Sequence, residues 1–163
     1  MAGINAHTGE IFGRTPGATE ISATIGGKTV RRTLNVAKPP IRINEIFTNG
    51  DLPGGFVELV NPSDFDIDLG GWSLSASRVF ATVILPAGLI IPAHGYRLIF
   101  ESNFPEGLAA SDAVHLFSRF GVQVDAFSFL GDPQLDDSRC PEIDGPFVVS
   151  VPTRRLPNAC SRE

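Results

Sequence analysis

Acidic side chains cluster within FVELVNPSDFDIDLGGWSL, residues 56–74, and they are the first candidates for chemistry. Glu58 with one of the nearby aspartates would suit a general acid and base pair. Asp64, Asp66 and Asp68, at positions i, i+2 and i+4, resemble the start of a calcium loop. Calcium needs six to eight converging oxygens, however, and this run lacks a glycine directly after the third acid and a later bidentate glutamate. We therefore interpret the run as a charged strand edge that discourages aggregation.

Structural roles in turns and strands can account for these residues without a catalytic or metal-binding function. Ser63 or Asp64 is expected to cap the turn after Pro62. Glu58 alternates with apolar neighbours in a predicted strand, so it needs a partner such as Arg42 or Arg97 if it is buried, and none if it is exposed.

The histidines do not form a recognisable site. His7, His94 and His115 are far apart, whereas a zinc site favours close ligand spacing or cysteine companions. No GxSxG nucleophile motif is present. Trp72 is interpreted as a core residue, because its neighbours are apolar. We therefore predict no catalytic, cofactor-binding or metal-binding residues, no cofactor, and no enzymatic activity.

Cys140 and Cys160 are the only cysteines, and they could form a metal half-site, a redox pair or a disulfide. Their spacing does not match a CxxC redox motif, and no second pair completes a zinc site. We predict a disulfide that pins a proline-rich tail, which favours an oxidising, extracytoplasmic setting.

The composition limits the classes of function. Hydrophobic residues make up 42% of the 163-residue chain, enough for one packed domain with a small appendage. The net charge of −5 argues against nucleic-acid binding, because the only basic clusters are Arg31-Arg32 and Arg154-Arg155. No segment approaches the roughly 20 apolar residues that a membrane span requires. The first ten residues lack the pattern of a signal peptide.

Residues 1–37 form a Thr- and Gly-rich zone with three strand candidates, at residues 9–12, 19–25 and 29–36. Gly26-Gly27 fits a two-residue hairpin turn. Pro39-Pro40 makes residues 38–40 a stiff linker. A ribbon of this size is marginal alone in water. We expect it to be ordered by packing on the following domain or by exchanging strands with a second copy in a two-fold dimer.

Residues 41–163 show many short strand patterns with turn residues between them, which favours an all-β sandwich. The expected strands are residues 41–47, 56–61, 72–77, 82–86, 96–101, 113–119, 122–129 and 147–151. Alternation places Ile43 and Glu45 on one face of the first strand and Asn44 and Ile46 on the other. The predicted core is Ile43, Val57, Leu59, Trp72, Leu74 and Leu98. Ligand-binding loops are expected at residues 48–55, 103–111 and 131–138.

Two resemblances to known families follow from longer motifs. TGEIFGRTPGATEISATIGGKTVRRTLNV in the first zone resembles the C-terminal half of a bacterial Ig-like adhesin domain. IRINEIF, GGFVELVNPS, LGGWSL and LPAGLIIPAHGY resemble the lamin tail domain, an Ig-like sandwich, over residues 41 to about 158. SRCPEIDGPFVVSVPTRRLPN resembles the closing segment of bacterial members, which end in Thr-Pro-Gly-x-x-Asn. This chain has Thr153-Arg154-Arg155 in place of Thr-Pro-Gly.

The resemblances imply a non-catalytic module of an exported or cell-surface bacterial protein. Such a module links or displays the neighbouring domains of a longer chain, and it binds a protein or a carbohydrate. The alternative is a nucleic-acid-associated accessory domain, either of a secreted nuclease or of a lamin-like scaffold.

Overall fold

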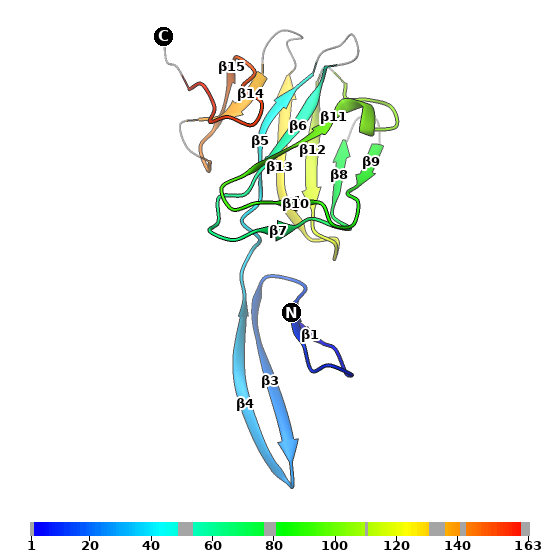
Figure 1. Cartoon of the computed structure of the whole chain (residues 1–163), viewed down its shortest axis with the longest axis vertical. Helices are drawn as coiled ribbons and strands as arrows, with labels where there is room; N and C mark the ends of the chain where they lie inside the picture. Colours follow the sequence, from blue (N-terminus) through cyan, green and yellow to red (C-terminus); the bar gives the residue numbers. More distant parts are fainter. Residues whose placement is uncertain are drawn as a thin grey trace. The chain divides into compact units, whose positions relative to one another are not determined.

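In the described parts of the chain, the regular elements are β-strands and one short 3-10 helix (Figure 1). The computed structural model describes residues 2–48, 54–76, 81–109, 111–130, 136–140 and 143–160. The chain divides into two units, Met1–Pro39 and Pro40–Glu163. No helix among these residues is long and apolar enough to cross a membrane.

The first unit contains two antiparallel pairs of strands. β1 (Ala2–Ile4) pairs with β2 (Ile11–Gly13), and β3 (Gly17–Ile25) pairs with β4 (Lys28–Val36). Gly26 and Gly27 have φ angles of 58° and 76°, as the predicted two-residue turn requires. The hairpin is therefore confirmed, whereas β1 was not predicted.

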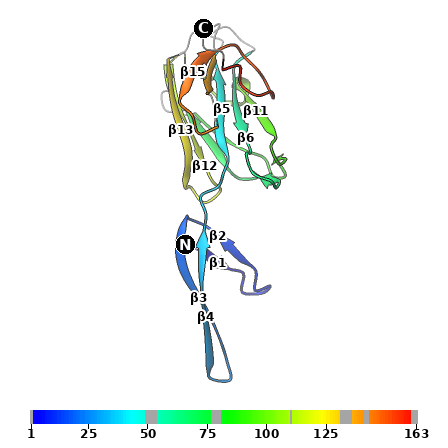
Figure 2. The same cartoon turned by 90° about the vertical axis from the view of Figure 1, so that its left-hand side faces the viewer.

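Two sheets pack face to face in the second unit (Figure 2). The five-stranded sheet has the order β11-β6-β5-β14-β15, and the four-stranded sheet has the order β13-β12-β8-β9. The strands of the first are β11 (Tyr96–Phe100), β6 (Phe56–Val60), β5 (Arg42–Phe47), β14 (Asp136–Arg139) and β15 (Phe147–Ser150). Those of the second are β13 (Gln123–Leu130), β12 (Ser111–Phe117), β8 (Ser73–Ala76) and β9 (Ala81–Ile84). The predicted all-β sandwich is confirmed.

Smaller elements complete this unit. β7 (Ile67–Asp68) pairs with β10 (Ile90–Ile91), and the 3-10 helix η1 spans Glu101–Asn103. Alternation did not predict β7 or β14. Of the three expected ligand loops, residues 49–53, 110 and 131–135 lie outside the described residues. The prediction of a loop at 136–138 was wrong, because β14 pairs there with both β5 and β15.

The core lies between the two sheets and includes five of the six predicted residues: Ile43, Val57, Leu59, Trp72 and Leu74. The prediction for Leu98 was wrong. Leu98 pairs with Glu58 and is half-buried on the outer face of the sheet, whereas Ile99 pairs with Val57 and enters the core. In YRLIF the residues Tyr96, Leu98 and Phe100 make one face fully apolar, whereas Ile99 shares the other face with Arg97, so alternation favoured the wrong face.

A β-bulge at Asn44 corrects the predicted faces of β5. Ile43 pairs with Leu59 and Glu45 with Glu58, so Asn44 is an extra residue between these two pairs. The bulge turns Asn44 and Glu45 to the outer face and brings Ile46, which pairs with Val57, into the core. Strict alternation had placed Glu45 with Ile43 and Ile46 opposite them.

A partly buried ion pair joins the two sheets at one edge. Arg139 Nη2 of β14 donates to Asp125 Oδ2 of β13 at 2.7 Å, and Arg139 Nε donates to the Ile43 carbonyl at 2.6 Å. The Ile43 amide donates to the same Asp125 oxygen at 2.9 Å. The Arg139 guanidinium also covers the Phe147 ring at 4.5 Å. These bonds connect β5, β13, β14 and β15 across the edge of the core.

Asn61 caps the turn after β6, a role that had been expected of Ser63 or Asp64. Its amide nitrogen donates to the carbonyls of Phe65, Ile91 and Pro92, and its oxygen accepts from Ser63. Because Asn61 is fully buried, these bonds also replace its lost hydration.

Replacing Trp72 with Ala should lower the free energy of unfolding by about 3–5 kcal/mol, the range for a buried aromatic residue. Trp72 is only 5% exposed and belongs to the core cluster. Leu98→Ala is the matched control, and it should cost about 1 kcal/mol because Leu98 lies outside that cluster. Urea unfolding followed by circular dichroism measures both. Equal losses for the two variants would contradict this assignment of the core.

Candidate functional site

The predicted acid run lies on the solvent-exposed surface beside β10. Asp64 Oδ1 contacts His94 Nε2 at 3.0 Å, Asp66 Oδ1 accepts from the Ala93 amide, and Asp68 Oδ1 accepts from the Gly70 amide. All three aspartates are exposed. Each carboxylate thus has its own local partner, and no group of three or more metal-ligating side chains occurs in the described parts of the chain.

The three histidines have separate environments. His7 lies in the turn between β1 and β2, and His94 follows β10 with a positive φ of 55°. His115 lies on β12, where its ring stacks on Phe117 with 6.2 Å between the centroids. Neither His94 nor His115 joins the acidic pair described next.

The most unusual polar feature is a pair of buried carboxylates on the outer face of the five-stranded sheet. Glu45 on β5 and Glu58 on β6 are directly opposite each other, and both are completely buried. Two like charges so placed destabilise the fold unless their oxygens are hydrogen-bonded. The bulge at Asn44 creates this pair, because it turns Glu45 to the face on which Glu58 lies.

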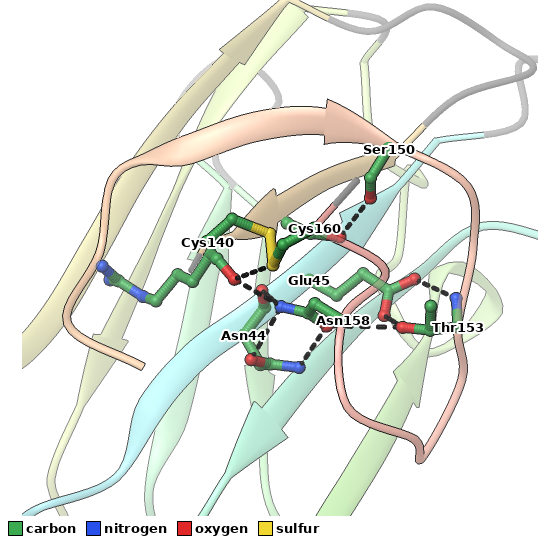
Figure 3. The surroundings of a disulfide bond; sticks show 9 residues. Asn44, Glu45, Cys140, Ser150, Thr153, Asn158 and Cys160 are labelled. Carbon is green, nitrogen blue, oxygen red and sulfur yellow. Dashed lines mark hydrogen bonds between the residues drawn. A yellow bond between two sulfur atoms is a disulfide. The ribbon is translucent and has the colours of Figure 1, made fainter. Parts of the chain in front are cut away.

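Residues 151–160, which we call the C-terminal strap, provide most of the donors. Figure 3 shows those that bind Glu45. Glu45 accepts from the Thr153 amide at 2.8 Å and from the Thr153 hydroxyl at 2.7 Å. Glu58 accepts from the Arg155 amide at 2.5 Å and from Asn44 Nδ2 at 2.8 Å. All four carboxylate oxygens therefore have a donor from the chain itself.

Asn158 fastens the end of the strap to the sheet (Figure 3). Its amide nitrogen donates to the Arg139 carbonyl at 2.8 Å and to Asn44 Oδ1 at 3.1 Å. Its oxygen accepts from Asn44 Nδ2 at 2.9 Å. Two residues later, Cys160 forms a disulfide with Cys140, which confirms the predicted bond.

The strap bends through a backbone conformation that favours glycine. Arg154 and Arg155 have φ angles of 27° and 63°. A non-glycine residue in the left-handed region costs about 1–2 kcal/mol. Arg155 occupies the position of the glycine in the Thr-Pro-Gly ending noted above. The bond from the Arg155 amide to Glu58, and the Arg154 guanidinium 5.1 Å above the Phe56 ring, hold this bend.

Burial raises the pKa of Glu58, and the nearby charge of Glu45 raises it further. The bonds from the Arg155 amide and from Asn44 oppose this increase, because they stabilise the ionised form. Burial is the largest of these effects, so the net direction of the pKa shift is upward.

This arrangement suits fastening better than catalysis. A general acid or base must have a carboxyl oxygen within reach of a substrate proton. Here the oxygens of Glu45 and Glu58 are bonded to protein donors under the strap. The expectation that a buried Glu58 would pair with Arg42 or Arg97 was wrong: Arg42 binds Asp144 at 3.0 Å, and Arg97 is exposed.

Sequence reasoning missed most of the residues that hold Glu45, Glu58 and the strap. Asn44 and Asn158 have polar side chains with no spacing that links them, and Arg155 contributes only a backbone amide to this bond. The single available signal was the resemblance of residues 153–158 to the Thr-Pro-Gly-x-x-Asn ending. Its Thr and Asn positions are the ones that bind here.

Comparison with known proteins agrees with this sandwich. The model of the Lamin Tail Domain family matches residues 35–131. The chain belongs to the lamin tail domain family. The sandwich is accordingly Ig-like, as the resemblance implied. The match ends before β14 and the strap, so the fastening of Glu45 and Glu58 lies partly outside the matched lamin tail region. No curated protein matches the chain.

Replacing Glu58 with Gln should change how the stability of this lamin tail domain depends on pH. Because the pKa of Glu58 is raised in the folded state above its usual 4.5, the folded protein holds this proton more tightly than the unfolded chain does. The contribution of Glu58 to stability therefore falls as the pH rises through the folded pKa. The difference in unfolding free energy, wild type minus Glu58→Gln, should decrease from about pH 4 to pH 8. Urea titrations at each pH measure it, and a difference that increases with pH would refute the upward shift.

Replacing Arg155 with Gly should relieve the strained bend in the strap. Arg155→Ala is the matched control, because it also removes the charged side chain but keeps a Cβ at φ 63°. We expect the Gly variant to be more stable than the Ala variant by about 1 kcal/mol. Thermal unfolding of both variants tests this expectation. An Ala variant at least as stable as the Gly variant would show that the strap does not need this conformation.

Proposed function

We propose that this lamin tail domain is a non-catalytic structural and interaction module of an exported or cell-surface bacterial protein. In this role it links or displays neighbouring domains and binds a protein or a carbohydrate, without a cofactor. The observation that carries the proposal is the disulfide-locked strap, whose donors occupy the buried Glu45 and Glu58. The residues best suited to acid–base chemistry therefore serve to fasten the chain.

The disulfide supports an extracytoplasmic location. Disulfides persist in oxidising compartments and are rare in the reducing cytosol. Cys140 and Cys160 join β14 to the end of a segment that has no regular strand pairing of its own, where a covalent bond adds most to order. This is the bond expected of a small module that must remain folded outside the cell.

The first unit supports a place within a longer chain. Its resemblance to half of a bacterial Ig-like domain implies a neighbouring domain that would complete it. Arrays of Ig-like modules display binding surfaces on loops and edges. We therefore assign the protein or carbohydrate partner to exposed surfaces and not to the buried carboxylates.

Nucleic-acid association is the second candidate, and the family relationship to nuclear lamins is its support. The net charge of −5 counts against it, because affinity for a duplex depends mainly on cations that contact phosphates. Binding to a 20-base-pair DNA duplex and to purified bacterial cell walls, side by side at about 150 mM salt, separates the two candidates. Retention on walls without DNA binding supports the surface role, and DNA binding without wall retention supports the alternative.

Replacing both cysteines with serine tests the fastening. The loop closed by Cys140 and Cys160 spans 20 residues, for which the chain-entropy relation predicts a loss of about 3 kcal/mol in unfolding free energy. We also expect faster tryptic cleavage after the exposed Arg154 and Arg155, because a loosened strap fits a protease more readily. Mass spectrometry of the fragments measures the cleavage. Equal stability and equal cleavage in both forms would remove the argument for a locked module.

A further inference from the structure

One face of the β3–β4 hairpin combines apolar and basic side chains. The cross-strand pairs Ala23–Val30 and Ile25–Lys28 share this face. Ile25 is 84% exposed and Val30 is 57% exposed. We call Ala23, Ile25, Lys28, Val30 and Arg32 the ribbon face; it contains two cations and no acid.

The opposite face of the hairpin has balanced charges. Arg31 Nη1 donates there to Glu20 Oε1 at 2.6 Å, so the one basic residue on that side has an acidic partner. The two faces therefore differ in kind: one is polar and charge-matched, and the other is apolar with two cations.

A surface of the opposite character lies on the sandwich. Asp64, Phe65, Asp66 and Asp68 follow one another in the chain, and Ile90 pairs with Asp68. Phe65 is 62% exposed and Ile90 is 48% exposed, beside three exposed carboxylates. We call these five residues the acidic patch. His94 beside Asp64, and Arg119 Nη2 bonded to the Asp68 carbonyl, are the basic groups that contact it.

The two units carry opposite net charges. Residues 1–39 contain five Lys or Arg and two Asp or Glu, which gives a net charge of +3. Residues 40–163 contain eight and sixteen, which gives −8. Surfaces of opposite potential attract each other and favour one orientation of binding. The ribbon face and the acidic patch are complementary in two respects. Their charges have opposite signs, and each exposes apolar side chains among those charges.

We propose that the ribbon face of one copy docks on the acidic patch of a second copy, and that the two copies do so reciprocally in a two-fold dimer. This inference rests on the proposed interaction role and names the partner as the chain itself. In a reciprocal dimer the contact forms twice, and the first contact raises the effective concentration for the second. Two small contacts can then hold a dimer that one alone would not.

Docking also meets a need of the ribbon itself. A two-stranded ribbon is marginally stable in water, and Ile25 and Val30 expose apolar surface that water disfavours. Covering them with Phe65 and Ile90 of another copy would bury apolar area on both partners. Lys28 and Arg32 would then lie against the aspartates, where opposite charge favours the complex.

Charge reversal on each surface, separately and together, tests the proposal on the full chain. Sedimentation velocity gives the dimer dissociation constant at about 50 mM and about 500 mM NaCl, where screening differs strongly. Lys28→Glu/Arg32→Glu and Asp64→Lys/Asp66→Lys should each weaken the dimer about tenfold or more, as should high salt. The chain that carries all four substitutions should recover most of the affinity, because its charges are again complementary.

Two further variants control for non-specific effects of added charge and for loss of the fold. Thr29→Glu/Thr33→Glu adds acids to the opposite face of the hairpin and should leave the dimer intact. Asp64→Asn/Asp66→Asn/Asp68→Asn keeps an oxygen for each backbone bond but removes the charge, so it should weaken the dimer without unfolding the domain. Thermal unfolding of every variant checks the fold.

A protein that stays monomeric, a dimer unaffected by either reversal, growth beyond a dimer, or failure of the fourfold variant to recover affinity would each overturn the proposal. A monomer retained on bacterial cell walls would overturn the dimer and leave the proposed function standing. Specific dimerisation together with DNA binding would support the dimer and contradict the proposed function.

Discussion

Two carboxylates buried opposite each other on neighbouring strands persist only if their oxygens find donors. In this domain the sheet cannot supply enough of them, because its amides are committed to strand pairing and Asn44 reaches only one oxygen of Glu58. The remaining three bonds come from Thr153 and Arg155. The path of the strap, including its two residues with positive φ, follows from the need to place these donors over Glu45 and Glu58.

The strap in turn explains why β6 is buried on both faces. Val57 and Leu59 face the core between the sheets, while Phe56 and Glu58 face the strap. Arg154 covers the Phe56 ring, so the outer side of this strand has its own local packing. The disulfide and Asn158 hold the covering segment in place. β6 has a charged residue on its outer face, as a half-exposed strand would, but it is completely buried because the strap lies over that face.

Sequence patterns predicted the turns and strands that depend on local backbone preference and alternation. They failed for features that are set by contacts with distant segments of the chain. The glycine turn of the hairpin and the strands around Trp72 follow from backbone preference and alternation. The bulge at Asn44 sets Glu45 opposite Glu58, a pairing that the sequence of β5 alone does not reveal. β14 is polar, and only its position between β5 and β15 makes it a strand. The partners of Glu58 were likewise out of reach, since one of them is a backbone amide nearly a hundred residues away.

Because the buried acids are bonded internally, recognition is left to exposed groups, and here the distribution of charge matters more than its total. A net charge of −5 conceals a basic ribbon next in sequence to an acidic sandwich. The ribbon unit has five cations, and one of them, Arg31, is already paired with Glu20. Proteins that bind DNA tightly through phosphates commonly use about 6–10 such contacts, more than this ribbon offers. Its few cations lie among exposed apolar residues, which no phosphate backbone would cover. That combination suits an acidic protein surface better than a nucleic acid.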